Sequence, residues 1–204
     1  MFQTNRMILL VALLASGGAY AAVGATQYTL DPARSELAWE GQKKLIDTKH
    51  SGTIALKAGS LQAKNTDIIT GSFEIDMNSI IDKDLDSAEY NAKLIGHLKS
   101  EDFFDVAKHP TAKFVVKKVK AIAGKDGTTH EVTGELTIKG KTLPVTFPAM
   151  ITQSGDELSA KGELTIDRTK WGLRYGSDQF FKSLGDKVIR DEIRFKLNLV
   201  AKKS

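Results

Sequence analysis

Hydrophobic and polar residues alternate one by one through much of this chain. Between residues 71 and 77, glycine and hydrophobic side chains at every second position alternate with serine, glutamate and aspartate. The same period of two runs through residues 132–138, 158–166 and 193–199. Because successive side chains of a strand point to opposite faces, each segment is predicted to be an antiparallel strand with one buried and one wet face.

Turn sequences separate these predicted strands. Glycine stands beside lysine, aspartate or serine at residues 125–127, 139–141 and 154–156. Seven or eight strands at such short spacing indicate a barrel or sandwich rather than a parallel α/β sheet. The fold class predicted from these patterns is therefore all-β and antiparallel, with about eight strands and one short helical segment; the choice of an antiparallel β-barrel comes from the family resemblance given below.

The helical segment is predicted at residues 88–100, where the period changes from two to that of a helix. The residues at helical spacing are Tyr90, Leu94, Ile95 and Leu98. They form an apolar stripe of three turns. Pro110 prevents further helix and releases the next strand, so the helix is expected to lie beside the barrel.

Glycines on the apolar faces of strands indicate bends or close approaches to the backbone. They are Gly41, Gly71, Gly134 and Gly162. Barrel curvature explains most such positions, and the others are candidates to line a cavity with room for a ligand.

Two prolines, Pro144 and Pro148, are four residues apart in a predicted strand over residues 143–151. Both lack the amide N–H that would point toward the same neighbouring strand. We therefore expect this strand to border a gap, an edge or a bulge, where a closed barrel would open. An unpaired edge also favours a homodimer by edge pairing.

The N-terminus has the features of a secretory signal peptide. Arg6 precedes the apolar run 7–15, and Ala19-Tyr20-Ala21 supplies small residues at the positions that a signal peptidase reads. The run is shorter than the roughly 20 residues that span a bilayer as a helix. We expect a signal peptide over 1–21, with cleavage after Ala25 as the alternative, and a periplasmic protein. Residues 22–204 are then long enough for one domain.

Composition narrows the chemistry and the partners. The chain has no cysteine, which excludes thiol catalysis and thiolate metal sites. Its 29 basic and 25 acidic residues give a net charge of +4. The densest basic cluster, Lys117, Lys118 and Lys120, has no interleaved aromatic residues of the kind that bind single strands, so we expect no nucleic-acid partner. A mild positive charge suits an acidic head group or transient contact with a membrane surface.

Metal binding has weak support in the sequence. The four histidines are His50, His97, His109 and His130. No pair is four residues apart, so a zinc site would have to be assembled from distant positions. Asp82, Asp84 and Asp86 alternate as in a calcium loop, but Ser87 and Lys93 stand where glycine and glutamate are required. A solvated loop is the preferred interpretation, and no metal site is predicted.

Catalysis also has little support. Glu101, Asp102 and Asp105 could supply acid and base groups, but acids near a helix terminus also stabilise it through the helix dipole. The sequence has no nucleophile elbow, phosphate loop or dinucleotide fingerprint. We expect a protein that is not an enzyme and has no catalytic residues.

Four sequence motifs, in the same order, resemble those of the YceI-like family. The longest is GHLKSEDFFDVAKHPTAKF over residues 96–114, and GELTIKGKT follows at 134–142. Ile166-Asp167-Arg168 with Trp171-Gly172-Leu173 resembles a family turn, and Tyr28-x-Leu30-Asp31 resembles its opening strand. The resemblance covers residues 28–202.

The resemblance implies an extended lipocalin-like barrel whose apolar lumen holds an isoprenoid tail. The inward-facing candidates for contact with that tail are Phe73, Ile75, Leu94, Leu98, Phe114, Leu136, Phe147, Leu164, Ile193 and Phe195. His97 and Arg168 are the candidates to contact a phosphate or quinone head group. No cofactor is expected apart from the bound lipid.

The function expected from sequence is that of a periplasmic carrier for an isoprenoid quinone or a polyprenyl phosphate. An enzyme that modifies such a lipid, and an interaction module with a filled core, are the two alternatives.

Overall fold

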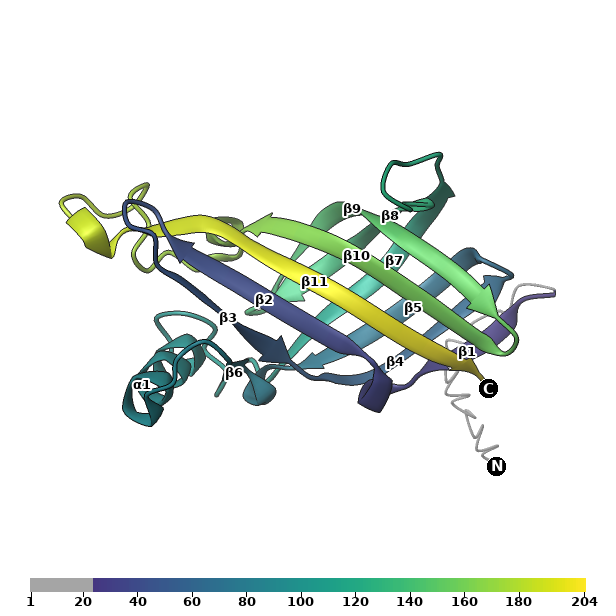
Figure 1. The fold of residues 1–204 in the computed structure, drawn as a ribbon, viewed down its shortest axis with the longest axis horizontal. Coiled ribbons are helices and arrows are strands. Elements are labelled where there is room, and N and C mark those ends of the chain that lie inside the picture. Colours follow the sequence, from purple (N-terminus) through teal and green to yellow (C-terminus); the bar gives the residue numbers. More distant parts are fainter. Residues whose placement is uncertain (1–23) are drawn as a thin grey trace, which may run out of the picture.

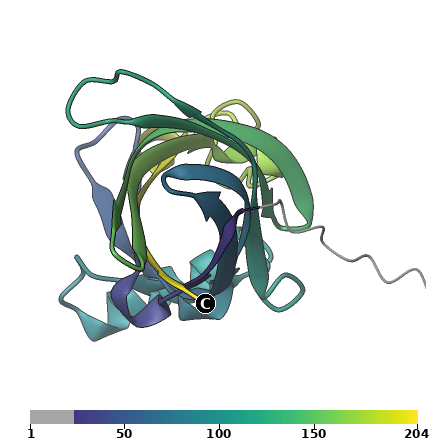
Figure 2. The same ribbon diagram turned by 90° about the vertical axis from the view of Figure 1, so that its right-hand side faces the viewer.

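A closed antiparallel barrel forms the body of the protein in the computed structural model, which describes residues 24–204 (Figures 1 and 2). The predicted signal peptide lies outside the described residues. The eight barrel strands are β1 (Thr26–Leu30), β4 (Leu56–Lys64), β5 (Asp67–Asp76), β7 (Thr111–Ala121), β8 (His130–Ile138), β9 (Lys141–Ser154), β10 (Glu157–Asp167) and β11 (Ile189–Lys203). They are hydrogen-bonded in that order, and pairing of β1 with β11 closes the barrel. The predicted fold class is confirmed.

Three further strands extend the sheet beyond the barrel, on the side of β11 that also pairs with β1. They are β2 (Glu36–Lys43), β3 (Lys49–Ile54) and β6 (Ile81–Asp82). The last residues of β11 pair with β1, and its earlier residues pair with β2, which continues to β3 and β6. Figure 1 shows β2 alongside β11, with β3 next to β2, and both strands extend toward the end of the molecule opposite the C-terminus.

Burial alternates along the strands, as the period of two predicts. In β8 every second residue from His130 to Ile138 is buried. On the outer face of the β8–β9 pair, threonine hydroxyls are hydrogen-bonded across the strands, at 3.0 Å for Thr133 with Thr146. Lys139 and Gly140 join these strands, both with positive φ (48° and 73°), as a two-residue hairpin turn requires.

Helix α1 (Ala88–Lys99) confirms the predicted helical segment. The hydroxyl of Ser87 accepts a hydrogen bond from the amide of Tyr90 and so caps the first turn. Leu98 is buried and Leu94 packs against the core, whereas Tyr90 is 62% exposed and does not belong to the apolar stripe. Within residues 24–204, no helix has the length and hydrophobicity needed to cross a bilayer.

Four short 3-10 helices connect the strands. They are η1 (Pro32–Arg34), η2 (Met77–Ser79), η3 (Arg168–Trp171) and η4 (Gly185–Lys187). η3 lies inside the predicted Ile166–Leu173 turn, where the indole N–H of Trp171 donates to the carbonyl oxygen of Leu136 at 3.0 Å.

The gap predicted beside the proline strand is present. β9 pairs with β8 from residue 141 to 149, but with β10 only from Ala149 to Ser154. Pro144 and Pro148 both lie in the part of β9 that has no β10 partner. The two residues without an amide N–H therefore lie in the part of β9 where the hydrogen-bonded ladder with β10 is absent. A homodimer through this strand stays a prediction.

Strand glycines serve two purposes. A Cβ on Gly134 would lie 2.3 Å from the ring of Phe114, so glycine allows that ring to cover the strand. A Cβ on Gly41 would meet nothing within 4 Å, and this residue borders an internal cavity.

Candidate functional site

The barrel interior contains an apolar cavity of about 130 Å³. Hydrophobic side chains from all eight barrel strands form nearly the whole of its wall. Seven of the predicted tail-contact residues line it: Phe73, Ile75, Phe114, Leu136, Phe147, Leu164 and Phe195. We call this the strand cavity.

A second cavity, of about 190 Å³, lies at the end of the barrel beside α1. Its wall combines β2, β3 and β11 with α1 and the residues that follow the helix. Six predicted residues line it: Leu94, His97, Leu98, Arg168, Ile193 and Phe195. We call this the helix cavity. All twelve predicted site residues thus lie on one of the two cavities, and their contact with a ligand stays a prediction.

The two cavities adjoin. Ile54, Phe104 and Phe195 line both of them. Phe104 is 7% exposed and packs edge-on against Phe103, with ring centroids 5.0 Å apart. These side chains therefore lie where the two cavities meet. Phe104 belongs to the motif over residues 96–114 but was not among the predicted tail-contact residues.

Arg168 is fully buried, and its guanidinium has a structural role. Its donors reach the carbonyl oxygens of Leu173, Tyr175, Ile189 and Arg190 and the carboxylate of Asp191, at 2.7–3.3 Å. Burial lowers the pKa of Arg168, and the charges of Asp191 and Asp167 oppose that shift. All five N–H groups are engaged within the described part of the chain. A head group would therefore have to replace a bond that already connects η3 and its following loop to β11.

His97 has a free nitrogen in the helix cavity. Its imidazole packs edge-on against Tyr175, with ring centroids 4.3 Å apart, and against Phe103 at 6.1 Å. Nε2 is buried and has no hydrogen-bond partner among residues 24–204. An unsatisfied buried polar atom costs about 1–3 kcal/mol. A polar ligand atom in the helix cavity would recover that free energy.

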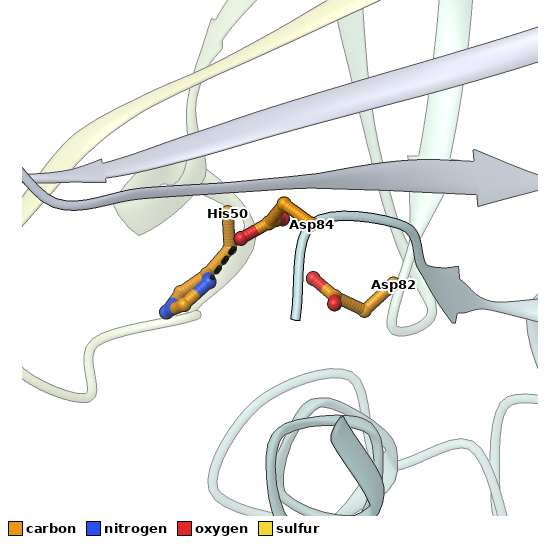
Figure 3. A group of neighbouring side chains, drawn as sticks. All are labelled: His50, Asp82 and Asp84. Atoms are coloured by element: carbon orange, nitrogen blue, oxygen red, sulfur yellow. Dashed lines mark hydrogen bonds and ion pairs between the residues drawn. The ribbon is translucent and has the colours of Figure 1, made fainter. Parts of the chain in front are cut away.

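A cluster of His50, Asp82 and Asp84 lies next to the helix cavity, which His50 also lines (Figure 3). Nδ1 of His50 is 3.0 Å from Oδ2 of Asp84. Burial raises the pKa of Asp82, with a further contribution from the Asp84 carboxyl. Burial opposes ionisation of Asp84 as well, but hydrogen bonds from Ser51 and His50 lower its pKa.

Sequence reasoning missed this cluster. The alternation of aspartates grouped Asp82 and Asp84 with Asp86, and His50 was weighed with the other histidines. In the structure Asp86 is exposed and is not in the cluster. No local pattern indicates the proximity of His50, because it depends on the pairing of β3 with β6.

Exposed apolar side chains surround the same end of the barrel. They are Leu45, Ile46, Tyr175, Phe180 and Phe181. An ion pair of 2.6 Å between Lys44 and Asp178 connects the β2–β3 hairpin with the loop that follows η3. Lys43, the last residue of β2, and Arg190, near the start of β11, line the helix cavity. This end therefore combines apolar and basic groups next to a cavity.

The fold and the cavities define a class of protein before any relative is considered. A small closed barrel with an apolar interior is an architecture that encloses small hydrophobic ligands. Residues 28–201 match the YceI-like domain. The chain belongs to the YceI-like family.

Known relatives and structures agree with this assignment. A UPF0312 protein of Pseudomonas putida is 36% identical over 155 residues, which are 72% of this chain and 70% of that protein. A UPF0312 protein of Pectobacterium carotovorum is 32% identical over 165 residues, 76% of this chain and 75% of that protein.

Among solved structures, BcnA of Burkholderia cenocepacia aligns with a TM-score of 0.62 and 27% identity, covering 85% of this chain and 99% of BcnA. A polyisoprenoid binding domain from Saccharophagus degradans, implicated in plant cell wall breakdown, aligns with a TM-score of 0.60 and 18% identity, covering 87% of this chain and 98% of that domain. The second likeness concerns the fold alone.

Proposed function

We propose that this protein is a carrier that holds an isoprenoid amphiphile, either an isoprenoid quinone or a polyprenyl phosphate, inside its barrel. The observation that carries the proposal is the change from an apolar to a partly polar cavity along the barrel interior. An apolar cavity enclosed by strands adjoins a second cavity that holds the unpaired Nε2 of His97. A long apolar tail with one polar end matches this arrangement.

The free energy of such binding comes mainly from the tail. Each buried methylene contributes about 0.8 kcal/mol, so ten of them give roughly 8 kcal/mol before the entropy costs of binding. An apolar cavity needs few polar groups to hold a ligand of this kind. The relation to the polyisoprenoid binding domain of Saccharophagus degradans supports the same ligand class.

The head group is assigned to the helix cavity. Neutral imidazole nitrogens act either as donor or as acceptor, so Nε2 of His97 suits a quinone carbonyl as well as a phosphate oxygen. Arg168 contributes by holding η3 and β11 together, because its own donors are committed to protein acceptors.

Cargo exchange is assigned to the same end of the barrel, through transient contact with a membrane. Leu45, Ile46, Phe180 and Phe181 are exposed there, and Lys43 and Lys44 directly precede Leu45 in sequence. Apolar residues with neighbouring lysines favour the interface of an anionic bilayer. The signal-peptide features of residues 1–21 support a periplasmic location for this exchange.

Mass spectrometry of organic extracts from natively purified protein tests the proposal. We expect a stoichiometric isoprenoid lipid in the extract, and rebinding of that lipid by the delipidated protein. An extract without lipid, together with failure to bind added polyprenyl compounds, would exclude carriage and leave the filled-core interaction module. Chemical change of the rebound lipid on incubation would instead indicate an enzyme.

A further inference from the structure

His50 lies in β3, and Asp82 and Asp84 lie at the end of β6 and just after it, in two segments that the backbone holds together. β3 and β6 pair through Gly52 with Asp82, and a Cβ on Gly52 would lie 1.8 Å from the carbonyl oxygen of Ile81. Only glycine permits this approach, which brings His50 and Asp82 to the same end of the strand pair. The chain then returns, and the amide of Lys83 donates to the carbonyl oxygen of Ser51 at 2.8 Å.

The two carboxylates are positioned by hydrogen bonds. Oδ1 of Asp82 accepts from the amide of Leu85 at 2.9 Å and from the side chain of Asn91 at 3.2 Å. Oδ1 of Asp84 accepts from the amide of Ser51. These bonds leave the second oxygen of each carboxylate directed to the cluster, where Oδ2 of Asp84 meets Nδ1 of His50 (Figure 3).

One oxygen in the cluster has no partner. Asp82 is only 7% exposed, and its Oδ2 makes no hydrogen bond with any residue from 24 to 204. Burying an unpaired carboxylate oxygen is costly unless a cation or a proton satisfies it. The nearby Lys83 does not neutralise it, because its ammonium group lies 3.9 Å from the carboxylate of Glu36.

We propose that His50, Asp82 and Asp84 bind a divalent transition-metal cation, with Zn²⁺ or Mn²⁺ as the best-matched ions. The three ligand atoms lie within 4.8 Å of one another. Ligand atoms about 2.1 Å from a tetrahedral zinc ion lie about 3.4 Å from one another, so the side chains must move together by up to roughly 1.4 Å to form the site.

The donor set selects the metal. One imidazole nitrogen with two carboxylate oxygens suits zinc and related transition metals, whereas calcium takes six to eight oxygen ligands. Three protein ligands leave a coordination position open for water or another small ligand. The bound ion would tie β3 to the segment that leads into α1, and so would hold the helix against the helix cavity.

Calorimetric titration of the full mature chain with ZnCl₂, and separately with MnCl₂, after removal of metals by chelation tests the proposal. We expect one ion per chain and an increase in Tm of a few degrees when metal is present, because the ion binds the folded state alone. Asp82→Asn keeps the acceptor for Leu85 and Asn91 but removes the anionic oxygen, and we expect at least a tenfold loss of affinity. His50→Gln should give a similar loss of metal affinity. Because the side chain of His50 is partly exposed, this variant replaces Asp82→Asn as the test if Asp82→Asn folds poorly.

Asp86→Asn is the matched control, since this exposed carboxylate lies in the same loop but outside the cluster. His109→Gln controls for zinc bound by a surface histidine. Both should bind metal as the parent protein does. Absence of one-to-one binding, or unchanged affinity in Asp82→Asn and His50→Gln, would overturn the proposal and leave a shared proton as the partner of Asp82. The readout is metal affinity, so it is independent of lipid carriage.

Discussion

The two cavities of the barrel differ in how they are built. The strand cavity is enclosed by alternating hydrophobic residues from regular strands, and its wall is almost free of polar groups. The helix cavity takes its wall from strands, a helix and irregular segments, and includes His50, His97 and Arg168. Regular strands thus produce a uniform apolar wall, whereas the irregular end introduces the polar groups. Under the proposed function, affinity for a tail and selectivity for a head group would therefore reside in different parts of one lumen.

The two ends of the molecule are also stabilised differently. At the helix end, a fully buried arginine connects η3 and its loop to β11. At the end that carries the C-terminus, exposed ion pairs join Arg34 with Glu157 and Asp31 with Lys202. Exposed pairs contribute little because water screens them, whereas breaking a buried network is costly.

Replacing Arg168 should have the largest effect on stability. Arg168→Met leaves four carbonyl oxygens and Asp191 without their donor, which is itself fully buried, so we expect a loss of about 3–5 kcal/mol in the free energy of unfolding. Urea denaturation followed by circular dichroism measures it. Lys170→Met, on the exposed face of the same 3-10 helix, should change stability by less than about 0.5 kcal/mol. Equal effects of the two variants would contradict the structural role of Arg168.

Filling the strand cavity should weaken binding of long tails. Ala160 lines this cavity, and Ala160→Phe would displace about two methylenes of a ligand, a loss of roughly 1.6 kcal/mol or tenfold in affinity. Short isoprenoids that do not reach the end of the cavity should bind as before. Titration with isoprenoids of increasing length measures the affinities for both long and short tails.

Thr165→Phe is the control for this substitution, because Thr165 is exposed on the outer face of the same strand. It should leave affinity unchanged for every tail length. A similar loss in both variants would mean that the strand cavity does not hold the tail.

Removing the imidazole of His97 should distinguish the contribution of the head group to binding affinity from that of the tail. His97→Leu deletes an unpaired buried nitrogen, so the stability of the free protein should stay equal or rise. Affinity for a lipid with a polar head should fall by roughly two- to tenfold, the worth of one hydrogen bond. A hydrocarbon tail without a head group should bind equally to both proteins. His109→Leu, outside both cavities, should show neither change.

The exposed pair at the other end should give the smallest effect. Arg34 lowers the pKa of Glu157 through a direct hydrogen bond, so ionised Glu157 stabilises the folded state. This contribution is present above the pKa of the unfolded state and is lost as pH falls through the lower folded-state pKa. Glu157→Gln should therefore reduce Tm slightly at neutral pH and leave it unchanged in strong acid. Thermal scans of the two proteins between pH 2 and 7 measure this difference in Tm. A difference that stays constant over the whole pH range would contradict the assignment.

Local periodicity accounts for most of the agreement between sequence and structure. Alternation over 132–138 and 158–166 predicts β8 and β10 because a strand with one buried face needs hydrophobic residues at every second position. The helix over residues 88–100 follows from the change of period and the later proline in the same way. Pro144 and Pro148 even locate a missing ladder, since a residue without an N–H cannot donate.

The sequence by itself therefore determined the all-β class, the alternating buried and exposed faces of the strands and the place of the helix, because each depends on the order of neighbouring side chains. Only the tertiary structure decided that Arg168 donates to protein carbonyl groups, that Phe104 lines both cavities, and that His50 meets Asp82 and Asp84. These contacts join residues that are distant along the chain. They depend on strand register and on how loops fold back over the barrel end, and the local pattern contains neither.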